Sequence, residues 1–146
     1  MAIEIRLISP PDRAVLGTVV PGVFDQDVDE RWSREFLDDP RHHLIAAFEE
    51  DRVIGFASAV HYVHPDKPPE LWINEVGVAP PYQRQGVARR LLGAMLDHGA
   101  SLGCTQAWVL TTPANTAALR LYETLGGIQA SEPAVLFEFP LAAKSP

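Results

Sequence analysis

The chain is poor in several features that mark specialised classes of protein. It has a single cysteine, Cys104, among its 146 residues, so no disulfide can form within it. A reduced, cytoplasmic setting is therefore the expectation. No apolar run is long enough to span a membrane, and no basic segment followed by an apolar stretch opens the chain. We accordingly expect neither a membrane partner nor a targeting segment.

Positive charge is also scarce. Twelve lysines and arginines stand against 19 acidic residues, which gives a net charge of −7. A general nucleic-acid binder needs a basic face to neutralise phosphates, so we expect no nucleic-acid partner. The negative balance suits a cationic ligand, although it equally serves solubility.

The composition, the length and the order of predicted elements are typical of one globular α/β domain. Hydrophobic residues make up 47% of the chain, and its length allows a sizeable core, so we expect a single domain over residues 1–146. Alternating and helical apolar patterns predict a strand, two short helices, three strands, a helix, a strand, a helix and a last strand. The predicted strands are 3–7, 43–49, 53–63, 71–78, 105–111 and 134–139, and the predicted helices are 14–20, 32–37, 87–102 and 115–125.

One glycine-bearing loop separates a predicted strand from the long predicted helix. The strand ends at Val78, the loop carries Gln83, Arg84 and Gly86, and the helix runs to Leu102. A helix N-terminus exposes unpaired N–H groups and about half a positive charge, so it attracts anions. Glycine also lets a ligand approach the backbone closely. The arrangement favours a pyrophosphate site, although a glycine at such a turn can serve packing alone.

The loop resembles the acetyl-CoA loop of the GNAT superfamily of N-acetyltransferases. The order Gln83-x-x-Gly86-x-Ala88 matches that family's pattern Arg/Gln-x-x-Gly-x-Gly/Ala. A second motif of the family follows the next predicted strand, with Asn115, then alanines, then a Leu-Tyr122 pair and a Leu-Gly pair. Both motifs stand in the family's order and separation.

The resemblance covers residues 53–127 well and implies both a fold and a cofactor. The implied fold is α/β, with a mixed, mostly antiparallel central sheet that splays between its fourth and fifth strands and is flanked by helices. Acetyl-CoA is the implied acetyl donor, its pantetheine arm pairing with the open strand edge. The implied cofactor-binding residues are Val76, Gly77, Val78, Gln83, Arg84, Gln85, Gly86, Val87, Ala88, Arg89, Asn115, Ala118 and Tyr122.

Two residues are candidates for catalysis by direct transfer from the donor to an amine. By resemblance, Tyr122 donates a hydrogen bond to the sulfur as it gains charge; packing against the sheet is the alternative. Glu75 stands in a hydrophobic strand, where a carboxylate is costly unless it is used or paired. A primary ammonium titrates near pH 10.4 and an ordinary glutamate near 4.3, a gap of about six units. Glu75 therefore acts as a base, either directly with a pKa raised by burial or through water, or it binds the ammonium, or it is a structural carboxylate paired with a cation.

The acceptor is predicted from the placement of acidic residues. An acidic segment lies between the two early helices, which line the acceptor cleft in this family. The layout from Phe24 through Val78 also resembles GNAT-type aminoglycoside 3-N-acetyltransferases, which suggests a small cationic amine such as an aminoglycoside. The candidate acceptor-binding residues are Asp25, Asp27, Asp29, Glu30, Glu70 and Glu75.

Several alternatives stay open at this point. The acceptor can instead be a polyamine or a protein amine, and the chain can be an acyl-CoA-binding module without turnover. His61 and His64 do not show metal-ligand spacing with other residues, so no metal site is expected. A homodimer stays open as the assembly.

Overall fold

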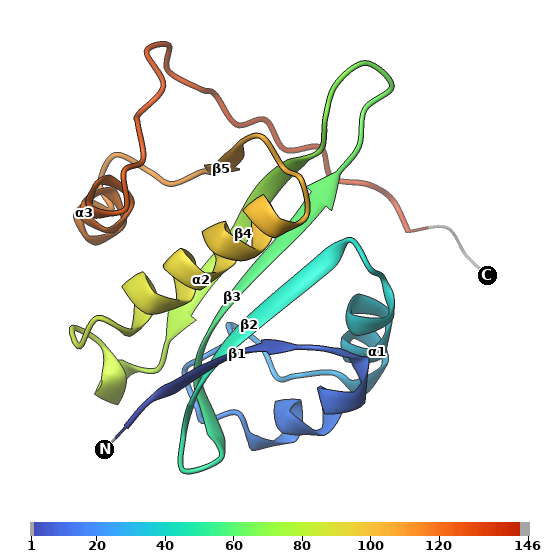
Figure 1. Cartoon of the computed structure of the whole chain (residues 1–146), viewed down its shortest axis with the longest axis vertical. Coiled ribbons are helices and arrows are strands. Elements are labelled where there is room, and N and C mark those ends of the chain that lie inside the picture. Colours follow the sequence, from blue (N-terminus) through green and yellow to red (C-terminus); the bar gives the residue numbers. More distant parts are fainter. Residues whose placement is uncertain (1, 144–146) are drawn as a thin grey trace.

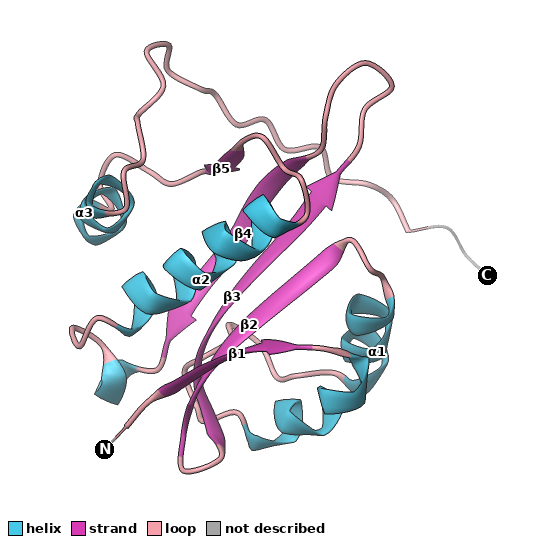
Figure 2. Cartoon of the chain, viewed as in Figure 1, coloured by secondary structure: helices cyan, strands magenta, loops and turns pink. Residues whose placement is uncertain are grey.

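The computed structural model describes residues 2–143 and contains one twisted sheet with helices on both faces (Figures 1 and 2). The strands are β1 (Glu4–Ile8), β2 (His42–Glu49), β3 (Arg52–Tyr62), β4 (Glu70–Val78) and β5 (Ala107–Val109). The helices are the 3-10 helices η1 (Pro10–Thr18) and η2 (Pro80–Tyr82) and the α-helices α1 (Glu30–Asp38), α2 (Val87–Ser101) and α3 (Thr116–Thr124). Within the described residues, no helix has both the length and the apolar character needed to cross a membrane.

The sheet has the order β1-β2-β3-β4-β5, antiparallel except for the β4–β5 pair. β2 and β3, which correspond to the predicted strands 43–49 and 53–63, form a hairpin. Glu50 and Asp51 form its turn with φ of 50° and 65°, the left-handed values that tight hairpin turns require. The mixed, mostly antiparallel sheet agrees with the predicted fold class.

The two faces of the sheet bury different sets of helices. On one face, the apolar stripe of α2 covers β3 and β4, with Leu91 and Met95 fully buried. On the other, η1 and α1 pack against β2 and β3 through residues such as Leu16 and Leu37. Side chains alternate between these two cores along each strand, so the face of a residue follows from its position.

A β-bulge interrupts that alternation in β4. Leu71, Ile73, Val76 and Val78 all pack in the α2 core, so two residues rather than one lie between Ile73 and Val76. The register shifts at this place, where Ser58 on β3 opposes Glu75 and the next pair is Ala59 with Ile73. A bulge places two consecutive side chains on one face of a strand.

The splay between β4 and β5 is present. The two strands pair only from Leu71 with Ala107 to Ile73 with Val109. β4 continues to Val78 beyond the last of these pairs, so the chain after β5 diverges from it. The predicted strand at 105–111 is therefore real but shorter than expected, because pairing ends where the strands separate.

Two other predicted elements differ from the structure. The first predicted helix is a 3-10 helix that begins at Pro10, where Ser9 and Asp12 form a capping box. The predicted last strand, 134–139, is wrong. The segment forms no strand, and its apolar residues Val135, Phe137 and Phe139 are 76–80% exposed. Its alternating pattern is typical of a strand, but a strand also needs a partner, and this segment has none in the described chain.

Candidate active site

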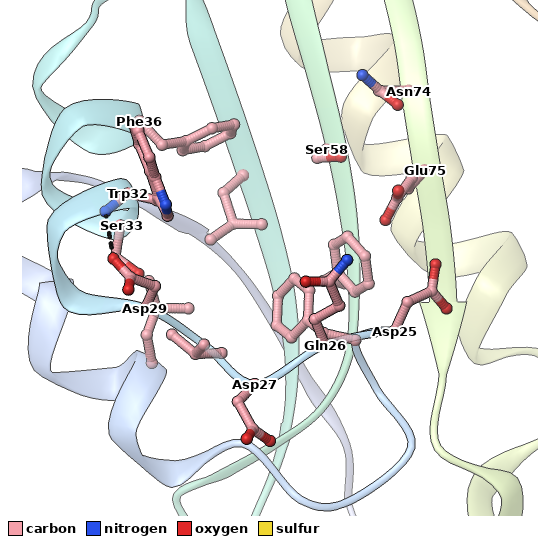
Figure 3. A pocket seen from close by; sticks show the side chains of 15 residues that line it. Asp25, Gln26, Asp27, Asp29, Trp32, Ser33, Phe36, Ser58, Asn74 and Glu75 are labelled. Atoms are coloured by element: carbon pink, nitrogen blue, oxygen red, sulfur yellow. Dashed lines mark hydrogen bonds between the residues drawn. The ribbon is translucent and has the colours of Figure 1, made fainter. Parts of the chain in front are cut away.

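A cavity of about 390 Å³ lies between α1, η1 and the sheet face opposite α2 (Figure 3). Its walls combine apolar and acidic side chains. The aromatic residues are Phe24, Trp32, Phe36 and Phe56, and the acidic residues are Asp25, Asp27, Asp29 and Glu75. Four carboxylates around one hollow favour a ligand with several positive groups.

The segment before α1 brings the acidic residues into the cavity wall. Phe24 anchors it by stacking on Phe56 of β3, with ring centroids 4.1 Å apart. Asp29 begins α1, and its carboxylate accepts a 2.9 Å hydrogen bond from the N–H of Trp32. Figure 3 shows Asp25 with Glu75 on the β4 side of the cavity and Asp29 on the α1 side. Asp29 thus has a structural role as the N-cap of α1, which Asp25 and Asp27 do not share.

Glu75 reaches the cavity because of the bulge. Asn74 and Glu75 are adjacent in β4, and both line the same hollow with Ser58. Both side chains are exposed rather than buried in the strand. The expected cost of a carboxylate in an apolar strand is therefore avoided, because the bulge directs Glu75 away from the α2 core.

The structure separates the other predicted acceptor residues from this group. Glu30 is outside the cavity lining and pairs with Arg34 at 3.2 Å on the exposed side of α1. Glu70 lies at the start of β4, where it accepts a 3.2 Å hydrogen bond from the hydroxyl of Tyr62. Of the six candidate acceptor-binding residues, four thus line the cavity and two lie outside it.

The glycine loop has the form that the sequence predicted. Gly86 is the residue before α2 and has a φ of 79°, and no side chain caps the helix there. A Cβ built on Gly86 would meet no atom within 4 Å, so this side of the loop is open. The side chains of Gln83 and Gln85 donate to the carbonyls of Val78 and Pro81 at 2.9 and 3.2 Å, which shapes the loop.

The last residues of β4, just before the loop, use their side chains for packing and leave only their backbone for a ligand. Val76 and Val78 pack their side chains in the α2 core, so only their backbone is available to a ligand. Gly77 is required by packing, because a Cβ there would lie 2.7 Å from the carbonyl oxygen of Val23 and 2.8 Å from the Phe56 ring. Beyond Ile73 this backbone is not paired with β5.

The second motif forms the start and middle of α3. Asn115 caps the helix by accepting a 3.1 Å hydrogen bond from the N–H of Ala118. Tyr122 packs against the α2 core and is partly buried. Burial raises the pKa of Tyr122 above its ordinary value, so the hydroxyl keeps its proton at neutral pH. Figure 1 shows α3 beside α2, on the β5 side of the sheet.

Several cavity residues were not predicted from the sequence. Trp32 is 58% exposed on α1, which is unusual enough for a tryptophan to suggest a ligand surface. Asn74 and Ser58 join the site only through the bulge, and a bulge between two apolar stretches leaves no clear pattern in the sequence. Of the predicted loop residues, Arg84, with a φ of 63°, and Arg89 are exposed, while the side chain of Val87 is buried.

The chain is similar to known proteins in both sequence and structure. The family model described as "Acetyltransferase (GNAT) family" matches residues 13–127. An aminoglycoside acetyltransferase from an uncultured soil metagenomic sample has a similar structure, with a TM-score of 0.82, 18% identity, and coverage of 96% of this chain and 97% of that one. At this identity the likeness shows the fold alone.

The relatives that are similar in sequence include three kinds of acetyltransferase. A mycothiol acetyltransferase of Kocuria rhizophila is 37% identical over 103 residues, 68% of this chain and 34% of that protein. A [ribosomal protein bS18]-alanine N-acetyltransferase of Escherichia coli is 39% identical over 57 residues, 39% of this chain and 38% of that protein. An aminoglycoside N(6')-acetyltransferase type 1 of Salmonella typhimurium is 32% identical over 77 residues, 50% of this chain and 53% of that protein.

These similarities support the predicted family more firmly than the predicted subfamily. The chain spans about a third of the length of the mycothiol enzyme and about half of the aminoglycoside enzyme. The aminoglycoside relative is named for the 6' position rather than the 3-N position that the layout suggested. On the match over residues 13–127, the chain belongs to the GNAT family of acetyltransferases.

Proposed function

We propose that the protein transfers an acetyl group from acetyl-CoA to an amine of a small polycationic acceptor. The observation that carries the proposal is the position of Glu75. It lines the acidic cavity and directly precedes Val76, where the backbone of β4 runs free of β5. One strand thus borders both the acceptor hollow and the donor edge.

The donor side fits an extended thioester with a pyrophosphate. The backbone of Val76–Val78 runs along an edge that no neighbouring strand of the described chain occupies over that length, and only the carbonyl of Val78 is engaged there, by Gln83. The uncapped start of α2 and the open side of Gly86 provide N–H groups for the phosphates. Arg84 and Arg89 add positive charge beside them. Acetyl-CoA supplies the acetyl group as a thioester.

The acceptor side fits several ammonium groups. Asp25, Asp27 and Glu75 surround the hollow, and each is exposed to it. Exposed ion pairs each contribute only about 0–1 kcal/mol, so recognition is spread over several of them. An aminoglycoside or a polyamine meets this requirement, and the aromatic residues of the cavity provide apolar contact for a ring.

Each catalytic residue has one role in this arrangement. Glu75 binds the reacting ammonium, and cavity water carries its proton away before the nitrogen attacks the carbonyl carbon. Tyr122 donates a hydrogen bond to the sulfur as the carbon–sulfur bond breaks. Its hydroxyl is protonated at neutral pH, as a tyrosine normally is, and burial raises its pKa further. A well-placed donor of this kind lowers the barrier because charge develops where it points.

A protein N-terminal amine is a second candidate acceptor. It is favoured by the similarity to the ribosomal-protein alanine acetyltransferase, although that match covers only 57 residues. A peptide needs to cross the cavity with a single positive end, whereas the four carboxylates suit several charges. The cavity therefore favours a small polycationic acceptor over a protein N-terminal amine.

Mass spectrometry of the products distinguishes the two candidates. The enzyme and acetyl-CoA are incubated with an equimolar mixture of an aminoglycoside, spermidine and an alanine-ended peptide. We expect one added acetyl group on the aminoglycoside or on spermidine. Acetylation of the peptide alone would replace the proposal with the second candidate. Absence of any acetylated amine would leave a binding module without turnover.

A further inference from the structure

Three aromatic residues outside the cavity form an ordered cluster near the β5 edge of the sheet. The indoles of Trp72 on β4 and Trp108 on β5 stack with centroids 5.3 Å apart and planes 9° from parallel. The ring of Tyr62 on β3 meets Trp108 edge-on at 6.4 Å. The two tryptophans are register partners in the parallel ladder, so the stack is fixed by the strands themselves.

The polar atoms of this cluster are already satisfied. Trp108 Nε1 donates a 2.7 Å hydrogen bond to the hydroxyl of Tyr62, which in turn donates to Oε1 of Glu70 at 3.2 Å. Lys67 lies 3.9 Å from the other oxygen of Glu70 and is largely exposed. The chain of bonds holds the partly buried rings in place, and within the described residues the second oxygen of Glu70 is engaged only in the long ion pair with the exposed Lys67.

The cluster faces the same side of the sheet as the cavity. Leu71, Ile73, Ala107 and Val109 pack in the α2 core, so Trp72 and Trp108, which alternate with them, project from the opposite face. That is the face of Asn74 and Glu75. Trp72 precedes Asn74 by two residues, which is about 7 Å along a strand.

The helices on this face cover only part of it. η1 and α1 pack on β2 and β3, and Figure 2 shows them on the β1–β2 side of the sheet, away from β5. Trp72, Trp108 and Tyr62 are only partly buried. An ordered, partly exposed aromatic surface with a carboxylate, on the same face of the sheet as an acidic cavity, is typical of a binding surface rather than of a core.

We propose that Trp72 and Trp108, with Glu70, form a second acceptor subsite that holds a non-reacting aminated sugar ring of a multi-ring acceptor. The inference rests on the proposed function and names its acceptor more narrowly. Indole faces attract both the C–H surface of a sugar and a nearby ammonium. Glu70 provides the counter-charge. A linear polyamine presents no ring and gains little from the stack.

The test compares two acceptors in matched variants. Initial rates are measured for a three-ring aminoglycoside and for spermidine with the wild type, Trp72→Leu, Trp72→Phe and Val63→Ala. Val63 is 68% exposed next to Tyr62 and serves as the control position. We expect Trp72→Leu to raise KM for the aminoglycoside about tenfold and leave kcat and the spermidine KM within twofold. Trp72→Phe should recover most of the affinity, and Val63→Ala should change nothing.

A second measurement separates the subsite from the chemistry. Binding of the aminoglycoside without acetyl-CoA is followed by calorimetry for the same variants, with melting temperatures as a check of folding. Weaker binding for Trp72→Leu alone supports the subsite, even if no amine is acetylated and the proposed function fails. Two results would overturn the inference and leave the cluster a role in aromatic packing alone. One is an equal rise in KM for both acceptors, and the other is an equal affinity for the aminoglycoside in all folded variants.

Discussion

Asn74 and Glu75 are consecutive residues of β4, yet both side chains line the same cavity. The bulge opposite Ser58 produces this arrangement while Ile73 and Val76 stay in the α2 core. A regular strand would place one of the two side chains in that core. The position of Glu75, the carboxylate we propose to be catalytic, therefore depends on one extra residue in the strand.

Replacing Glu75 should affect turnover more than binding. Glu75→Gln keeps the shape of the side chain but removes the charge that holds the reacting ammonium, so we expect kcat to fall about 10- to 100-fold. Asp25→Asn and Asp27→Asn should mainly raise the acceptor's KM a few-fold, and less so at high salt. Steady-state rates at two ionic strengths measure both. Glu35→Gln, an exposed position of α1 outside the cavity lining, is the matched control.

Gly86 should control affinity for acetyl-CoA. Asparagine tolerates a positive φ better than other residues with a side chain, so Gly86→Asn preserves the loop and fills its open side. We expect the Kd for acetyl-CoA to rise about tenfold or more in calorimetry. Gly103→Asn is the control, because Gly103 has a φ of 84° and similar open space at the other end of α2. Equal affinity in both variants would remove the loop from the donor site.

Tyr122 should act on the chemical step. Tyr122→Phe keeps the ring packed against the α2 core and removes only the hydroxyl. Loss of one donor at a charging centre costs on the order of 100-fold in turnover. Single-turnover rates at saturating acetyl-CoA measure the effect, with the melting temperature and the donor Kd expected to match the wild type. A wild-type rate under these conditions would exclude the role.

Three histidines should make the fold sensitive to acid. His43 lies between His61 and His98, with nitrogen–nitrogen distances of 2.7 and 3.0 Å. Burial, and then repulsion from His98 and His61, lowers the pKa of His43 from 6.5 to about 4, despite an opposing contribution from Asp39. The unfolded chain therefore binds the proton more readily, so the stabilisation is complete above pH 6.5 and is lost as the pH falls toward 4.

Chemical denaturation measures that loss. Between pH 7.5 and 4 we expect the free energy of unfolding to fall by roughly 1–3 kcal/mol on account of His43. His43→Gln should flatten this part of the profile, whereas replacing the exposed His64 with Gln should not. The same slope in the wild type and His43→Gln would assign the acid sensitivity to other groups.

The parts of the site that follow from local sequence could be predicted. The turn at Gly86 and the cap at Asn115 depend on residue types at fixed places relative to a helix, so the sequence contains their signals. The acidic segment at Asp25 and Asp27 was found for the same reason, since it lies between two recognisable helices.

The parts that depend on tertiary pairing could not be predicted. The bulge that turns Glu75 into the cavity is a property of the β3–β4 register. Glu30 and Glu70 are separate from the other carboxylates because Glu30 lies on the exposed side of α1 and Glu70 lies at the far end of β4. The contact of His43 with His98 joins residues that are 55 positions apart. The predicted strand at 134–139 is wrong because an alternating pattern does not reveal whether a partner strand is present.

The most direct test of the account is acceptor-dependent release of the CoA thiol from acetyl-CoA. Rates are compared for the wild type and the double variant Asp25→Asn with Glu75→Gln, using an aminoglycoside, spermidine and an alanine-ended peptide as acceptors. We expect fast release with a polycationic acceptor and a loss of at least 100-fold in kcat/KM in the double variant, with the donor Kd unchanged. Release that is independent of any amine, or equally fast in the folded double variant, would contradict acetyl transfer in this acidic cavity.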